Sequence, residues 1–195
     1  MLFRSPFKAI VAPRPIGWIS SLANDGTVNL APFSFFNAMS ENPPIVAMGI
    51  NGSHSEGGAK DSLDNIEATK EFVCNMVSYS QREKMNLSSA MLPRSVDEFD
   101  YAGVTKEPST LVKPPRVKES LAHLECVHYK TIILPSDNPK VVNSMVLGEV
   151  VGIHISDEII VDGMIDMKKY QPLARLGYMD YCHVDDTFSM DRPIV

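Results

Sequence analysis

Several features that would assign a function directly are scarce or missing in this chain of 195 residues. Its three cysteines, Cys74, Cys126 and Cys182, lie far apart and form no C-x-x-C pair. That spacing argues against a disulfide framework and a cysteine zinc site, and favours reduced thiols in the cytoplasm. The longest apolar runs, such as residues 45–50, are too short to cross a bilayer, so we expect no membrane span. No long apolar segment stands at the N-terminus, so we expect no signal peptide.

Clustered positive charge is also missing. The formal net charge is −6, and the lysines and arginines are scattered along the chain. Nucleic-acid-binding domains commonly carry a basic stripe, so we expect no nucleic-acid partner.

The common catalytic motifs are absent as well. The sequence contains no G-x-x-x-x-G-K-[ST], no G-x-G-x-x-G after a strand, no H-E-x-x-H and no G-x-S-x-G. His123 and His128 are an odd number of residues apart on a predicted strand, so they point to opposite faces and cannot share a metal. We therefore predict no metal site. If the protein is an enzyme, a cofactor is expected to carry the chemistry.

What is present indicates one globular domain rich in β-structure. The hydrophobic fraction of 44% and the charged fraction of 22% are near the globular average. The loop-like stretches 51–59 and 105–115 do not separate two self-sufficient halves, so we assign residues 1–195 to a single domain.

The pattern of strands predicts an antiparallel barrel. Residues 16–22 and 28–31 are β-prone and flank an Asp25-Gly26 pair, which is a strong hairpin signal. Residues 45–50 are apolar on both faces and predict a central strand. Further strands are expected at 71–77, 121–134, 144–155 and 159–161, followed by a turn at 162–163. Short helices are expected from a cap at Asp61 or Ser62, over 81–88 and around 173–176. Few helices and no βαβ alternation favour a barrel over a doubly wound sheet.

Residues 57–62, Gly-Gly-Ala-Lys-Asp-Ser, could hold a phosphate. Glycines let the backbone approach a ligand, and the N–H groups at a helix N-terminus attract an anion. Lys60 would add a charge, and Ser62 would add a hydroxyl donor. On the local sequence alone, an ordinary loop before a capped helix is the commoner explanation.

The segment 29–37 could present polar groups to a planar ring. Pro32 interrupts regular strand pairing, and Ser34 and Asn37 alternate with aromatic residues. The competing interpretation is core packing, which we expect for Phe33 and Phe35. Trp18 on the neighbouring strand is also more typical of a core than of a ligand site.

Taken together, these segments resemble the flavin-reductase-like, FMN-binding split-barrel family, in particular its flavoredoxin-like subgroup. The resemblance begins with residues 12–21, 29–37 and 43–46. It continues in the expected order through residues 60–62, 71–75, 112–117, 147–151 and 172–177. Each motif is modest, but the ordered set covers nearly the whole chain.

The resemblance implies a mainly β Greek-key split barrel that forms a homodimer and binds one FMN per subunit near the dimer interface. It places the isoalloxazine and ribityl chain against Trp18, Ile19, Ser20, Ser21, Ser34, Phe35, Phe36 and Asn37. It places the phosphate near Lys60, Asp61 and Ser62. Arg175 and Tyr181 are expected near the flavin or the substrate pocket. Arg14 is either an anion contact or an ordinary surface arginine.

The activity implied is transfer of electrons from NAD(P)H through FMN to an unknown acceptor, with the chemistry on flavin N5. Many reductases of free flavin carry a Gly-Asp-His triplet before the strand at 148–150, whereas residues 142–147 here contain no histidine. That departure favours a protein that retains its FMN. The alternatives are an electron carrier that acts only with a protein redox partner, a barrel that binds haem or pyridoxal phosphate, and a barrel with no cofactor.

Overall fold

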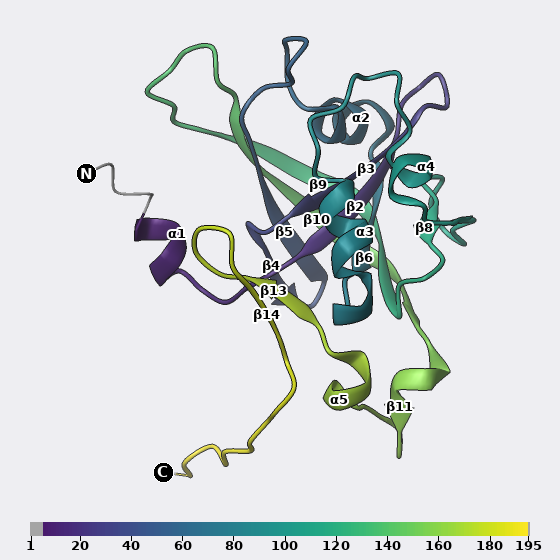
Figure 1. Cartoon of the computed structure of the whole chain (residues 1–195), viewed down its shortest axis with the longest axis vertical. Coiled ribbons are helices and arrows are strands. Elements are labelled where there is room, and N and C mark those ends of the chain that lie inside the picture. Colours follow the sequence, from purple (N-terminus) through teal and green to yellow (C-terminus); the bar gives the residue numbers. More distant parts are fainter. Residues whose placement is uncertain (1–5, 195) are drawn as a thin grey trace.

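A curved, seven-stranded antiparallel sheet forms the body of the protein (Figure 1). The computed structural model describes residues 6–194. The strand order is β3-β2-β6-β9-β10-β5-β4, and every neighbouring pair is antiparallel. The strands are β2 (Gly17–Leu22), β3 (Val28–Phe33), β4 (Phe36–Glu41), β5 (Pro44–Asn51), β6 (Glu71–Met76), β9 (Ala122–Leu134) and β10 (Asn143–Ile155). The predicted antiparallel architecture with few, short helices is confirmed.

The predicted hairpin joins β2 to β3. The N–H of Ala23 donates to the carbonyl of Thr27 at 2.8 Å, and the carboxylate of Asp25 accepts from the N–H of Thr27 at 2.9 Å. Gly26 has φ of 93°, which a residue without a Cβ adopts freely. The sequence prediction for this turn is confirmed.

The predicted strand at 45–50 is confirmed as β5, which pairs with β10 on one side and with β4 on the other. The strand β4 was not predicted. Its residues after Phe36 are exposed, so it has no apolar alternation to reveal it.

The helices are short and lie outside the sheet. They are α1 (Pro6–Ile10), α2 (Asp61–Thr69), α3 (Arg82–Leu87), α4 (Glu98–Ala102) and α5 (Met167–Tyr170). Among the residues described, no helix is long and apolar enough to cross a membrane. The expectation that Asp61 or Ser62 caps α2 was wrong: the N-cap is Lys60, whose side chain makes no capping hydrogen bond.

The helix expected around residues 173–176 was also wrong. Those residues form β13 (Leu173–Arg175), which pairs with β1 (Arg14–Pro15) and β14 (Tyr181–His183) in a separate three-stranded sheet. The pairing partner β1 lies far away in sequence, and local propensity does not report such contacts.

Two short hairpins complete the fold, β7 (Lys106–Glu107) with β8 (Arg116–Val117) and β11 (Ile160–Val161) with β12 (Met164–Ile165). The predicted turn at 162–163 is confirmed, with φ of 51° at Asp162 and 78° at Gly163.

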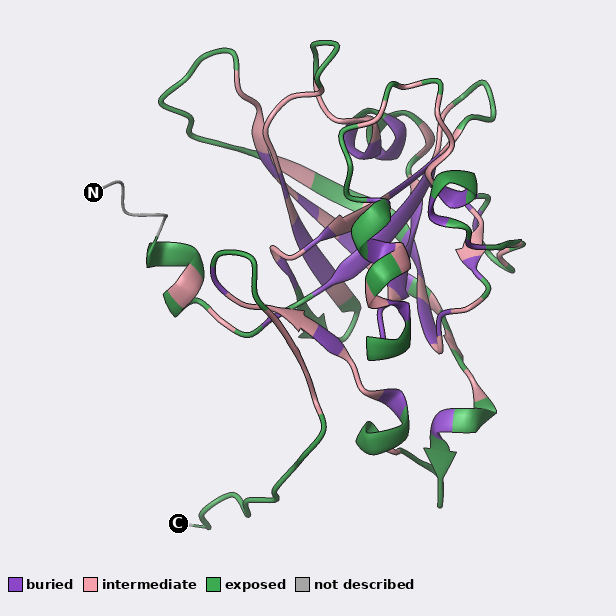
Figure 2. Ribbon diagram, viewed as in Figure 1, coloured by how far each residue is buried: buried purple, intermediate pink, exposed green. Residues whose placement is uncertain are grey.

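The sheet carries most of the buried residues (Figure 2), and the buried apolar side chains form two clusters. One cluster lies inside the curve of the sheet and includes Phe72 from β6 and Ile66 from α2. The other includes Trp18 from β2 and Phe99 from α4. Through Ile19 and Trp18, β2 therefore packs closely against these two helices next to the site described below.

Candidate functional site

Three neighbouring cavities run from the N-terminus of α2 to the sheet formed by β13 and β14. The first, of about 140 Å³, is lined by Lys60 and Ser62. The second, of about 270 Å³, shares Pro32 and Ser89 with the first. The third, of about 700 Å³, shares five residues with the second, namely Met85, Asn86, Arg175, Met179 and Tyr181. Because each cavity shares part of its wall with the next, we call the three together the track.

The first cavity has the donors that a phosphate needs. Within residues 6–194, the N–H groups of Asp61 and Ser62 donate to no other group of the chain, whereas those of Leu63 and Asp64 already donate to the carbonyl of Lys60. Burial lowers the pKa of the Lys60 ammonium from its usual value, so the charged form is poorly compensated here. An anion at this helix terminus would relieve both deficits.

Asp61 also lines the first cavity, and its carboxylate is paired. It pairs with the guanidinium of Arg94 and lies 3.6 Å from Nε2 of His54. Arg94 also donates to the carbonyls of Gly57 and Ala59, each at 3.0 Å. Arg94 therefore neutralises the acidic residue and fixes the glycine loop. No sequence motif indicated this arginine, because it lies more than thirty residues further along the chain than Asp61.

The hydroxyl of Ser62 is already committed as a donor. It donates to Oδ1 of Asn29 at 2.7 Å, and Nδ2 of Asn29 donates in turn to Oε1 of Glu98 at 3.1 Å. Burial raises the pKa of the Glu98 carboxyl despite its hydrogen bonds from Asn29 and the N–H of Leu30. Ser62 was expected to supply a hydroxyl donor, but the structure uses that hydrogen to lock β3 against α2. Asn29 and Glu98 were not predicted as site residues.

The expected ring-binding residues separate into two groups. Ser34 lines the second cavity together with Pro32 and Ile16. Phe35 is half-buried against Gly49, and its carbonyl accepts from the N–H of that glycine at 2.7 Å. By contrast, Phe36 belongs to the inner core, and the exposed Asn37 accepts with its side chain from the N–H of Ala38.

The segment from Trp18 to Ser21 is buried and does not line these three cavities. Nε1 of Trp18 donates to Oγ of Ser88 at 2.8 Å, and Ile19 lies in the inner core. Ser20 donates to the carbonyl of Pro115, and Ser21 accepts from Asn65. In this chain these four residues belong to the packed interior beside the track.

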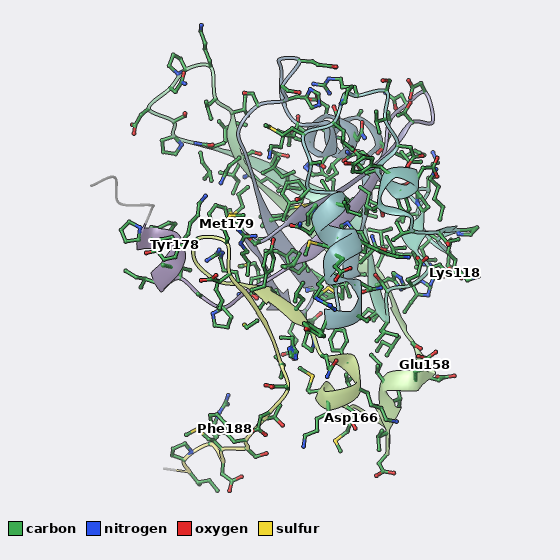
Figure 3. All side chains as sticks on the ribbon, viewed as in Figure 1. Lys118, Glu158, Asp166, Tyr178, Met179 and Phe188 are labelled. Atoms are coloured by element: carbon green, nitrogen blue, oxygen red, sulfur yellow. The ribbon has the colours of Figure 1, made fainter. Side chains whose placement is uncertain are left out.

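Arg175 and Tyr181 lie opposite each other on β13 and β14, and both line the second and third cavities. Cζ of Arg175 lies 4.2 Å from the centroid of the Tyr181 ring, and Nη2 donates to the carbonyl of Tyr178 at 2.6 Å. The loop that carries Tyr178 and Met179 lies against α1 (Figure 3).

Arg14 is no surface residue, since only 7% of it is exposed. Its guanidinium donates to the carbonyls of Lys8, Val11 and Leu176, while its Nε is buried without a partner. Burial lowers the pKa of Arg14, and the charge of Arg175, its cross-strand neighbour, lowers that pKa further. Two like charges are thus held side by side next to the second cavity.

The third cavity has an aromatic and apolar lining. The rings of Tyr79 and His183 are stacked with centroids 4.2 Å apart, and Arg82 lies 4.2 Å above the same tyrosine. Met85, Leu173 and Met179 supply apolar surface. Within residues 6–194, no group of three or more His, Cys, Asp and Glu side chains is placed to hold a metal ion.

The donor set of the track fits a phosphorylated planar cofactor. A lysine and two unused N–H groups stand at one end, and half-buried aromatic residues stand further along. Two carboxylates line the first cavity. Asp61 is paired with Arg94, and the raised pKa and hydrogen bonds of Glu98 reduce its repulsion of an anion.

Solved structures of known proteins identify the fold. A protein from Shewanella frigidimarina with a split barrel domain has a TM-score of 0.83 and 23% identity, covering 96% of this chain and 90% of that one. Component B of nitrilotriacetate monooxygenase from Bacillus cereus has a TM-score of 0.87 and 26% identity, covering 97% and 95%. The 2-nitrobenzoate 2-nitroreductase NbaA from Pseudomonas fluorescens has a TM-score of 0.82 and 31% identity, covering 96% and 89%. The protein thus has a split β-barrel fold.

The family follows from the sequence of the domain. Residues 11–174 match the model of the flavin reductase like domain. The chain therefore belongs to the flavin reductase-like family, as the resemblance in its motifs predicted.

Proposed function

We propose that the protein is an FMN-dependent oxidoreductase that transfers electrons from NAD(P)H to a small-molecule acceptor. The observation that carries this proposal is the pairing of a phosphate-type site at α2 with an adjoining track that ends in an aromatic cavity. Phosphate and planar ring are the two parts of FMN that differ most in their chemistry, and each meets suitable residues here.

The residues of this chain bind and orient the cofactor. Lys60 and the N–H groups of Asp61 and Ser62 would hold the phosphate, and Ser34 and the backbone around Pro32 would face the ribityl chain and ring edge. When bound, FMN supplies the two-electron chemistry that the side chains lack. The packed interior beside the track restricts water, which strengthens electrostatic interactions inside the track.

The large third cavity is the observation that favours a small-molecule acceptor. A volume of about 700 Å³ next to the ring-binding region is in the usual range for a ligand pocket. We therefore prefer an enzyme to an electron carrier that needs only a docking surface for another protein.

Steady-state oxidation of NADH and NADPH by the purified, FMN-loaded protein is the test of this activity. We expect turnover with a small-molecule acceptor alone. Turnover that appears only after a partner reductase is added would contradict the proposal and identify an electron carrier.

We also propose that the protein is a homodimer. Large apolar side chains remain exposed on β9, β10 and the β11–β12 hairpin, among them Tyr129, Ile133, Ile153 and Met164. Exposed apolar surface of this extent is typical of an interface. A homodimer would cover it, in line with the family resemblance.

A further inference from the structure

Among the residues that the structure describes, the positive charge of Arg175 has no acidic partner. Within residues 6–194, neither Arg175 nor Arg14 forms an ion pair. The two arginines face each other across β1 and β13, so their charges add rather than cancel. In a protein with a formal net charge of −6, such an uncompensated pair is a local exception.

The two arginines differ in what they can offer a ligand. Arg14 uses its guanidinium on three backbone carbonyls, so it contributes mainly charge. Arg175 makes one hydrogen bond to the chain, from Nη2 to the carbonyl of Tyr178. A guanidinium has five N–H donors in a planar fork, so most of its donors remain available to a carboxylate.

The surroundings of Arg175 determine the shape of the ligand. Arg175 lines both the second and the third cavity, and its plane is held over the ring of Tyr181. Met85, Met179 and Leu173 form the apolar part of the wall, and the Tyr79–His183 stack adds a flat face. A flat apolar ring would bury its surface here while its anionic group met the guanidinium.

Other charges in the cavity are already paired or exposed. Arg82 lies 3.2 Å from the carboxylate of Glu83, and it also donates to the carbonyl of Tyr79. Asp185 lines the far part of the third cavity and is exposed. The second cavity, between Ser34 and Arg175, has no acidic lining residue.

We propose that the third cavity binds a planar aromatic carboxylate, with the carboxylate on Arg175 and the ring among Met85, Met179 and Tyr181. The role of this ligand as the second substrate rests on the proposed flavin function. Its binding does not, because every group invoked belongs to the chain itself.

The direct test compares benzoate with benzamide, its neutral isostere, by isothermal titration calorimetry on the FMN-loaded protein. We expect benzoate to bind at least about tenfold more tightly, because only benzoate can form a charge-assisted, bidentate pair of hydrogen bonds with Arg175. Equal affinities, or no binding of benzoate, would overturn the proposal.

Two variants locate the contact. Arg175→Gln should weaken benzoate binding by about tenfold or more and leave benzamide unchanged, whereas Arg175→Lys should fall between them because it keeps the charge and loses the fork. Arg82→Gln is the matched control, since it removes a tyrosine-stacked guanidinium from the same cavity that is already paired. An equal loss in both Gln variants would show a general charge effect and contradict the role assigned to Arg175.

The outcomes also separate this inference from the proposed function. A protein that takes up no FMN but binds benzoate through Arg175 would contradict only the flavin proposal. A protein that holds FMN and oxidises NADH, yet does not prefer benzoate to benzamide, would contradict only the proposed carboxylate site at Arg175. Thermal melting of each variant shows whether it is folded.

Discussion

A Cβ at position 148 would lie 2.2 Å from Cζ of Phe72, which is fully buried in the inner core. The backbone of Gly148 does not require a positive φ, so only the lack of space demands glycine there. Gly148→Ala should therefore destabilise the protein by roughly 1–3 kcal/mol through overpacking. Urea unfolding measures this change.

A second substitution checks the cause of that loss. Phe72→Leu shortens the side chain that meets the new methyl group. The double variant Gly148→Ala, Phe72→Leu should be more stable than the sum of the two single effects predicts. Simple additivity would show that the clash is not with Phe72.

Glu125 is a fully buried carboxylate held by four hydrogen bonds. It accepts from the N–H groups of Thr110, Leu111 and Val112 and from Nε2 of His154 at 2.6 Å. Burial opposes its ionisation, but these donors outweigh burial and lower the pKa of Glu125. The carboxylate thus fixes the 110–112 loop against the β9–β10 pair.

This arrangement predicts a loss of stability in acid. A folded pKa below the unfolded value, about 4.3 for glutamate, gives stability that is present above that pH. The stability is lost as the pH falls from there through the lowered folded pKa. Glu125→Gln should cost about 2 kcal/mol or more near neutral pH, because an amide cannot accept all four bonds. It should also flatten the acid limb of a stability–pH curve; an unchanged limb would assign that limb to other carboxylates.

At the scale of elements, the proposed FMN site depends most on helix α2. Lys60→Met removes the ammonium at its N-terminus while keeping much of the apolar stem. We expect FMN affinity to fall by about tenfold or more, as for loss of a charged hydrogen bond. Flavin fluorescence titration measures it.

Riboflavin provides the control, because it has the same ring system and no phosphate. Its affinity should change by less than about twofold in Lys60→Met if the lysine contacts only the phosphate. An equal loss for both flavins would place Lys60 near the ring instead.

The elements that the sequence could predict are those with a local cause. The β2–β3 hairpin follows from Asp25-Gly26, and the long strands β9 and β10 follow from their extended β-prone runs. The strand β13 could not be predicted, because it is held by a two-residue strand near the other end of the chain. The same limit applies to Arg94, which reaches Asp61 through space rather than through a motif.

The site was predicted unevenly for the same reason. Lys60 and Ser34 line the track and Arg175 lies over the ring of Tyr181, whereas their contacts with FMN stay a prediction. The motif around Trp18 gave no measure of burial, so sequence alone did not reveal that Trp18 to Ser21 are covered by α3, α4 and the 110–117 region.

At the scale of the whole molecule, the exposed apolar ends of β9 and β10 predict association. Light scattering after size exclusion should give a mass near twice 21.6 kDa. Ile153→Lys replaces a side chain that is 61% exposed in the single chain, so it should leave the fold intact and shift the protein toward monomer. A wild-type monomer would contradict the proposed dimer. The C-terminal tail around Phe188 extends away from the barrel (Figure 3).

The most direct test of the central claim is the visible absorption spectrum of the freshly purified protein, with mass identification of any released chromophore. We expect a flavin spectrum and release of FMN, because the phosphate-type site at α2 should retain the phosphorylated cofactor. A colourless protein that also fails to take up added FMN, or one that releases haem or pyridoxal phosphate, would contradict it.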